Sequence, residues 1–193
     1  KARAMVFPRT VLAGHGVLEA LGSSCRQFDF PDQGAVITGT KTRAIAGDRA
    51  AEILRGSGFR VDTVLVGEAT PAEVGRVETE VRKLGARFIV AVGGGTKIDI
   101  AKVVAARLRV PFVSVPTSAA HDGISSPRAS LHDPDKVTSI EAVVPTGVIA
   151  DTSVIVQAPF RLLASGCADV LSNTTAVLDW KLAARLRNEE YSS

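Results

Sequence analysis

The sequence predicts an α/β protein with a Rossmann-like parallel sheet in its N-terminal domain, followed by the start of an all-helical C-terminal domain. Up to residue 151, short apolar runs alternate with helical patterns of about a dozen residues, as in βαβ units. The run at residues 88–92 has no polar alternation, which indicates a strand buried on both faces. From Pro159 the pattern is helical only. We therefore predict two domains, residues 1–157 and residues 158–193.

The composition limits the class of protein. The 193 residues are 46% hydrophobic, enough for one domain with a sizeable core, or one domain and a fragment. The net charge is +3 with scattered basic residues, so no nucleic-acid partner is expected. No run approaches the ~18 apolar residues of a membrane span, and no signal peptide is visible. Cys25 and Cys167 are too few for a disulfide framework and indicate reduced thiols in a cytoplasmic protein.

The first half of the chain supplies four strands in order. Residues 11–13 form a short apolar piece, and residues 17–21 a helical turn or two. A strand at residues 35–38 leads to a helix at residues 43–55, which Gly56 and Gly58 end. A strand at residues 61–66 follows, and Thr70 before Pro71 suits the N-cap and first position of a helix that ends near Leu84. Then come the strand at 88–92, a helix at 96–108 and a strand at 112–115.

The second half changes character. Residues 130–131 and 137–140 flank a polar turn at 132–136 and predict a hairpin, and residues 147–150 predict another strand. Helices are predicted over residues 160–165 and 168–187. In the second helix, apolar residues at helical spacing predict a buried stripe. Its members are Val170, Leu171, Thr174, Val177, Leu178, Leu182 and Leu186.

The turn at Gly93, Gly94 and Gly95 is the strongest candidate site. Glycine accepts positive φ and lets a ligand approach the backbone, while free N–H groups at a helix start attract anions. Strand, glycine turn and helix therefore predict a phosphate site. The spacing is neither G-x-G-x-x-G nor a P-loop. The alternative is a tight turn that binds no ligand.

Two other segments are expected at the same edge of the sheet, because ligands bind beyond the carboxyl ends of parallel strands. They are residues 39–42 and the hydroxyl-rich segment 116–127. The alternative for segment 116–127 is a surface loop that binds no ligand. Asp169 follows Gly166 and Cys167 at the predicted start of a helix, where the helix dipole alone favours a carboxylate.

Three stretches carry a family resemblance: VGGGTKIDIAK, SVPTSAAHDGISSP and GCADVLSNTTAVLDWKLA. They resemble the sn-glycerol-1-phosphate dehydrogenases, which belong with iron-type alcohol dehydrogenases, glycerol dehydrogenase and dehydroquinate synthase. The resemblance implies an α/β nucleotide-binding domain followed by a helical domain for metal and substrate. It implies an oxidoreductase that reduces dihydroxyacetone phosphate to sn-glycerol 1-phosphate with NADP(H) or NAD(H) and Zn²⁺, for phospholipid biosynthesis of archaeal-type membranes.

By match to the family motifs, the resemblance also assigns residue roles. Asp122 would bind substrate, while Asp169 would be catalytic, ligate zinc and lie against substrate. The chain would form a homo-oligomer. Two histidine ligands are expected in the helical domain, yet His15, His121 and His132 all precede it, so we expect a fragment that is inactive alone. The cofactor contacts would be Gly93, Gly94, Gly95, Thr96, Lys97, Ile98, Asp99, Thr117, Ser118, Ala119, Ala120 and Ser126.

Other functions remain open on the sequence. A dehydroquinate synthase-like enzyme or another polyol dehydrogenase shares the glycines and the metal, and a non-catalytic nucleotide-binding module fits the length. For the cofactor, Lys41 and Arg43 lie where NAD-specific sheets place an acid, which predicts that NADPH is used at least as well as NADH. Alternatively, both are solvated residues of a helix start.

Overall fold

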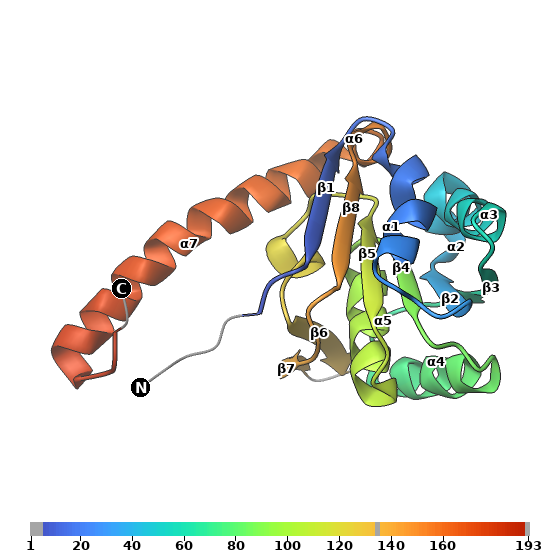
Figure 1. Cartoon of the computed structure of the whole chain (residues 1–193). Helices are drawn as coiled ribbons and strands as arrows, with labels where there is room; N and C mark the ends of the chain where they lie inside the picture. Colours follow the sequence, from blue (N-terminus) through green and yellow to red (C-terminus); the bar gives the residue numbers. More distant parts are fainter. Residues whose placement is uncertain (1–5, 134–135, 192–193) are drawn as a thin grey trace.

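A six-stranded, fully parallel sheet organises the protein, as a computed structural model that describes residues 6–133 and 136–191 shows (Figure 1). The strand order is β1-β8-β5-β4-β2-β3. The predicted α/β class and Rossmann-like sheet are confirmed. The strands are β1 (Thr10–Gly14), β2 (Gln33–Thr38), β3 (Arg60–Leu65), β4 (Ile89–Gly93), β5 (Phe112–Pro116) and β8 (Gly147–Asp151).

Helices cover both faces of this sheet. On one face lie η1 (Val17–Ala20), α1 (Leu21–Gln27) and α3 (Asp48–Gly56), and on the other lie α4 (Pro71–Lys83) and α5 (Gly95–Leu108). Because successive side chains of a strand point to opposite faces, β2 supplies Val36 to the first layer and Ile37 to the second. The two cores therefore share one sheet, and its central strands are buried on both sides.

The strand order reverses between β2 and β4. β2 leads into α3 on one face, whereas β4 leads into α5 on the other, although the two strands are hydrogen-bonded neighbours. The two connections therefore diverge beyond the carboxyl ends of these strands. Such a reversal of strand order is where open α/β sheets bind ligands.

The helix that follows β2 starts earlier than predicted and is irregular. It begins with α2 (Thr40–Thr42), continues as a π-helical turn, η2 (Arg43–Gly47), and becomes α3. The early start has a local cause, because the Gly39 N–H donates to the Thr42 hydroxyl at 2.9 Å and so satisfies a helix-end donor. At α4 the predicted N-cap is confirmed: the Glu73 N–H donates to Thr70 Oγ1 at 3.1 Å.

A hairpin and two short helices complete the body. The hairpin strands are β6 (Arg128–Asp133) and β7 (Lys136–Glu141), paired antiparallel and longer than predicted. Of the predicted polar turn, Pro134 and Asp135 lie outside the described residues. The segment after β5 contains η3 (Asp122–Ile124), and α6 (Thr152–Ile155) follows β8.

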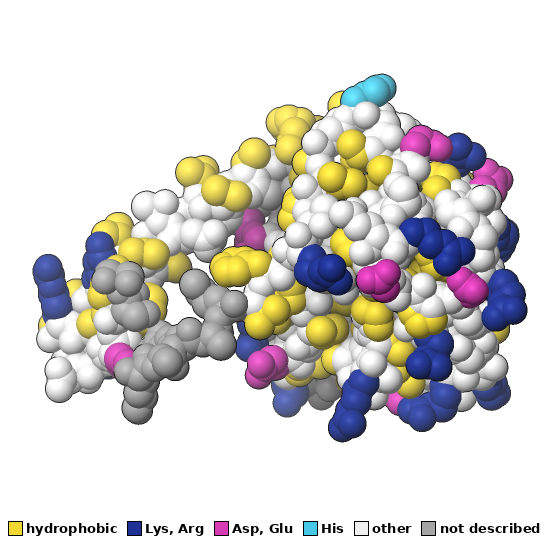
Figure 2. Space-filling view, viewed as in Figure 1, with side chains coloured by type: hydrophobic (Ala, Val, Ile, Leu, Met, Phe, Trp, Pro, Cys, Tyr) yellow, Lys and Arg dark blue, Asp and Glu magenta, His cyan; other side chains and the backbone are white. Residues whose placement is uncertain are grey.

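The C-terminal part is one continuous helix, α7 (Phe160–Arg187), so the predicted break near Gly166 is wrong. The predicted buried stripe is also wrong: Val170 is 67% exposed and Leu186 75% exposed. The helix runs away from the sheet, and its hydrophobic side chains are visible along its length (Figures 1 and 2). Helical periodicity determines which face of a helix is apolar, but that face is buried only where a second surface covers it.

Among the described residues, no helix has the length and hydropathy of a membrane span. The boundary at residue 157 stays a prediction.

Asp151, at the end of β8, holds the turn that follows β1. It is 3% exposed, and its carboxylate accepts the N–H groups of Gly16 at 3.0 Å and Leu18 at 2.9 Å, besides that of Ser153. Burial by itself raises the pKa of Asp151, but the hydrogen bonds from the Ser153 hydroxyl and from these N–H groups outweigh burial and hold the pKa below its ordinary value.

We predict that Asp151→Asn lowers the free energy of unfolding by about 1–3 kcal/mol at pH 7, because an amide cannot accept this set of donors. A carboxyl with a lowered folded-state pKa stabilises above its unfolded pKa, near 3.8, and that stability is lost as pH falls through the folded pKa. The difference between the two proteins should therefore shrink in acid. Urea unfolding at pH 7 and pH 3 measures it, with Asp62→Asn on the exposed side of β3 as control. Equal losses in both variants would contradict the role.

Candidate functional site

The glycine turn after β4 does not use left-handed backbone. Gly94 has φ −77° and ψ −178°, an ordinary extended conformation that precedes the first residue of α5. The expectation of positive φ in this turn is wrong, because an extended N-cap residue already leads from strand to helix. Among the described residues, the glycines with positive φ are Gly16, Gly58 and Gly85.

The missing Cβ atoms matter instead for close approach. A Cβ on Gly93 would lie 2.6 Å from Lys97 Cγ, and one on Gly95 would lie 2.0 Å from His121 Nε2. Both glycines are therefore required by the protein's own packing. At Gly94 the one described atom near such a Cβ, chain neighbours aside, is Ser118 Oγ at 3.5 Å, an ordinary contact. The open side of Gly94 is thus space that the described packing leaves unused.

Lys97 lies across the carboxyl ends of three strands. Its Cε is 2.5 Å from where a Cβ of Gly39 would be, beyond β2, and its Nζ donates to the Gly67 carbonyl at 2.6 Å, beyond β3. Burial lowers the pKa of Lys97, opposed by the nearby carboxylates of Glu73 and Glu68. The side chain therefore lies over the carboxyl ends of β4 and β2 and reaches the residues after β3.

The start of α5 offers donors to an anion. The N–H groups of Lys97 and Ile98 both donate to the Gly94 carbonyl, at 3.0 and 3.2 Å. Those of Gly95 and Thr96 are the first-turn donors that α5 itself does not use. The segment after β5 is fixed against this turn, because the Thr117 N–H donates to the Gly93 carbonyl at 3.0 Å. Backbone donors, the helix dipole and the nearly buried Ser118 thus surround the open side of Gly94.

Three predicted cofactor contacts are placed differently from the rest. The Ile98 side chain is fully buried in the core, so only its backbone is near the turn. The Asp99 carboxylate is 9% exposed and accepts hydrogen bonds from within the protein. Ser126 is half-buried and lines neither of the cavities described below. Whether these residues touch a cofactor stays a prediction.

Asp122 and Asp169 meet although they lie far apart in the sequence. The Asp122 N–H donates to Asp169 Oδ2 at 2.9 Å. The helix reaches the loop closely because Gly166 has no side chain: a Cβ there would lie 2.0 Å from the Ala119 carbonyl oxygen. Asp169 lies well inside α7, so the predicted helix-start position is wrong. Its place comes from the contact of α7 with the loop, not from the helix dipole.

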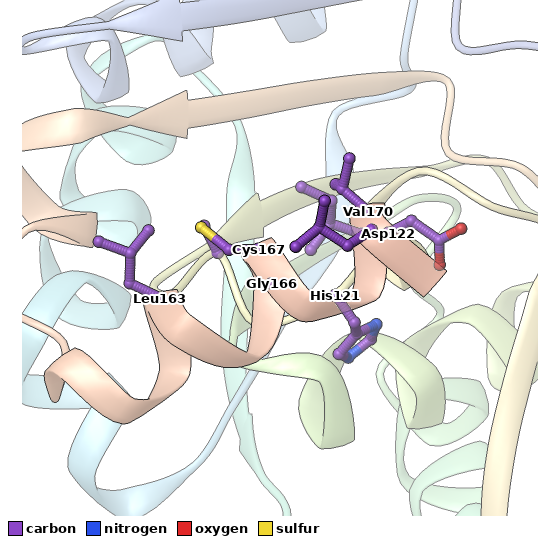
Figure 3. A pocket seen from close by; sticks show the side chains of 9 residues that line it. His121, Asp122, Leu163, Gly166, Cys167 and Val170 are labelled. Carbon is purple, nitrogen blue, oxygen red and sulfur yellow. The ribbon is translucent and has the colours of Figure 1, made fainter. Parts of the chain in front are cut away.

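Two adjoining cavities are lined in part by these residues. A cavity of about 470 Å³ brings the glycine turn together with both acids, two histidines and the hairpin. A second, apolar groove of about 610 Å³ lies between α7 and the loop, with Leu163 and Cys167 on the helix side (Figure 3). The first cavity is lined by Gly95, Thr96, Asp99, His121, Asp122, Ser130, His132, Val137 and Asp169.

His121 is a site residue that sequence reasoning did not assign. Its Nδ1 accepts the Gly123 N–H at 2.9 Å, so a neutral imidazole carries its proton on Nε2, beside Gly95. Figure 3 shows the ring pointing away from Leu163 and Cys167. The signal in the sequence that could have identified His121 is its position directly before Asp122, a predicted substrate-binding residue.

The described residues do not complete a metal site. Within residues 6–133 and 136–191, no group of three or more histidine, cysteine, aspartate or glutamate side chains is arranged to hold a metal ion. A catalytic zinc uses three protein ligands, and only Asp169 was predicted to be one. The donor set present here therefore does not fit a metal by itself.

Comparison with known proteins gives a consistent family. The sequence model of the iron-containing alcohol dehydrogenase family matches residues 12–159. Glycerol-1-phosphate dehydrogenase (NAD(P)+) of Methanosarcina acetivorans is 47% identical over 190 residues, which cover 98% of this chain and 53% of the relative. The Methanothermobacter thermautotrophicus enzyme of the same name is 50% identical over 190 residues, 98% of this chain and 54% of the relative. The chain thus spans about half the length of the curated relatives it matches.

Solved structures agree on the fold. Glycerol dehydrogenase from Schizosaccharomyces pombe superposes with a TM-score of 0.78 at 27% identity, covering 89% of this chain and 44% of that one. An iron-containing alcohol dehydrogenase from Thermotoga maritima gives a TM-score of 0.78 at 21% identity, covering 89% and 54%.

Proposed function

Because this chain belongs to the iron-containing alcohol dehydrogenase family, we propose that it forms the cofactor-binding part of an enzyme that reduces dihydroxyacetone phosphate to sn-glycerol 1-phosphate with NADPH or NADH. The relatives named glycerol-1-phosphate dehydrogenase (NAD(P)+) support this substrate and cofactor. The observation that carries the proposal is the open side of Gly94 at the head of α5. A role in membrane phospholipid synthesis, a cytoplasmic location and a homo-oligomeric state stay predictions.

In this proposal, the pyrophosphate of the cofactor binds at the glycine turn. The N–H groups of Gly95 and Thr96 donate to its oxygens, and the missing Cβ of Gly94 gives the phosphate room to approach the backbone. The Ser118 hydroxyl lies on the same side. The bound cofactor supplies the hydride, while these residues hold and orient the cofactor. We place the rest of the nucleotide across the ends of β2 and β4, where the strand order reverses.

The substrate, in the same proposal, binds in the adjoining cavity beside Asp122 and Asp169. Carboxylates accept hydrogen bonds from substrate hydroxyls, and the Asp122 N–H fixes one oxygen of Asp169. We propose that the other Asp169 oxygen is one ligand of a zinc ion. Zinc would polarise the ketone, and the described residues supply only part of its ligand set.

Oxidation of glycerol 1-phosphate with NADP⁺ tests the activity, using the longest form of the protein that the gene encodes. We expect reduced nicotinamide to form with sn-glycerol 1-phosphate and not with sn-glycerol 3-phosphate, the matched control. Formation with glycerol alone would support another polyol dehydrogenase, and phosphate release from a dehydroquinate synthase substrate would support that class. Cofactor binding without any turnover would support a non-catalytic module.

We predict that Gly94→Val weakens NADPH binding about tenfold or more, because a branched side chain fills the space proposed for the phosphate. Titration of the cofactor fluorescence measures the Kd. Gly75→Val is the matched control: Gly75 is a helix residue of α4 whose Cβ would meet no atom within 4 Å. Unchanged affinity in a folded Gly94→Val protein would remove the phosphate site from this turn.

We predict that the unmodified chain binds NADPH at least as tightly as NADH. Lys41 is exposed and makes no ion pair with the described residues, whereas Arg43 pairs with Asp48 at 2.8 Å. Lys41→Glu should reduce the preference for NADPH about two- to fivefold, since an exposed charge acts weakly on a 2′-phosphate. Lys83→Glu, at the end of α4, makes the same charge change elsewhere. Equal effects of both variants on the Kd ratio would show that the 2′-position is recognised by other residues.

A further inference from the structure

We propose that Lys102 and Asp99 are a buried positioning pair that fixes segment 122–130, which carries Asp122, against the cofactor helix α5. The inference rests on the proposed function for its catalytic meaning, but its geometry stands independently. It assigns Asp99 a different role from the cofactor contact that the family motif predicts.

Lys102 is fully buried, with 0% exposure, on the face of α5 that lies against the segment. Its Nζ donates to the carbonyl oxygens of Gly123 at 2.7 Å and Arg128 at 2.6 Å, and to Asp99 Oδ1 at 3.3 Å. An ammonium has three donors and no acceptor, so these three partners satisfy it completely. Two of them are backbone groups at the two ends of one loop.

Asp99 makes the third connection to the same segment. It lies one helical turn before Lys102, and its Oδ2 accepts the Ser130 N–H at 3.1 Å. One carboxylate oxygen therefore holds Lys102 and the other holds the start of the hairpin. Both oxygens are engaged inside the protein, so we infer that Asp99, which also lines the 470 Å³ cavity, acts on the site through the segment.

Burying these charges is costly unless each one is paired and hydrogen-bonded. Gly123 belongs to η3 and Arg128 is the first residue of β6, and the carbonyls of both accept from the Lys102 ammonium of α5. A lysine ammonium supplies donors to both from a single point. Burial lowers the pKa of Lys102, and the carboxylates of Asp99 and Asp122 oppose that shift.

The consequence reaches the site through Asp122. The segment places the Asp122 N–H on Asp169 and the Gly123 N–H on His121, whose ring packs on Gly95. The pair therefore sets the distance between the glycine turn and the two acids. In a hydride transfer, that distance aligns the cofactor with the substrate, so a small displacement of either one lowers the rate strongly.

The test uses Asp99→Asn and Lys102→Met in the 193-residue chain, with Glu19→Gln as matched control for loss of an ion pair elsewhere. Amide hydrogen exchange is followed in peptides covering 121–131 and in α4, which reports global opening. We expect Asp99→Asn to speed exchange in 121–131 about tenfold beyond any change in α4, because one buried charged hydrogen bond is lost. NADPH affinity should be retained. In an active longer form, KM for the phosphorylated substrate should rise and KM for NADPH should not.

Several results would overturn the proposed positioning role of Lys102 and Asp99. Equal acceleration in 121–131 and α4 would mean a general loss of stability. Unchanged exchange with weakened NADPH binding would make Asp99 a cofactor contact. If Lys102→Met does not fold, Asp99→Asn decides alone. Failure of the unmodified chain to bind NADPH would count against the proposed function, while the exchange comparison would still decide whether the pair holds the segment.

Discussion

The candidate site depends on how closely three chain segments approach one another beyond the carboxyl ends of β2, β4 and β5. Lys97 passes over Gly39 and Gly93, and the His121 ring lies on Gly95, at distances that leave no room for a Cβ atom. The strands are parallel neighbours, so a Cβ atom at these positions would force the Lys97 or His121 side chain to move. The head of α5 then remains exposed between them, with its unused N–H groups and the open side of Gly94. The packing of the segments and the proposed anion site therefore have the same structural cause.

Buried charges, each matched by backbone groups, hold the segments in this arrangement. Asp151 ties the end of β8 to the turn after β1, and the pair of Asp99 and Lys102 ties α5 to the segment before the hairpin. Loops outside the sheet have backbone donors and acceptors that no strand or helix satisfies. A charged side chain from a neighbouring element satisfies them with strong hydrogen bonds and fixes the loop. Asp151 and the pair of Asp99 and Lys102 thereby give the irregular segments a defined position at the edge of the sheet.

The helix α7 shows how a site residue can be set by a single contact. Gly166 lets the helix approach Ala119, and the Asp122 N–H then reaches Asp169. Beyond this point, Leu182, 54% exposed, belongs to an apolar face that the described residues leave uncovered. One small interface, between α7 and the loop, thus places the two acids at the cavity that the glycine turn also lines. Relatives about twice as long carry further chain that this sequence does not include.

The sequence by itself determined most of the succession of strands and helices from β2 to β8, and the N-cap at Thr70. These features follow from periodicity and local capping, which depend on neighbouring residues. The family was also evident from three short stretches. The backbone of the glycine turn, the place of Asp169 and the role of His121 were decided only by tertiary structure. Each depends on contacts between distant segments, such as Asp122 with Asp169, 47 residues apart. Burial along α7 likewise depends on a partner surface, which no helical periodicity can specify.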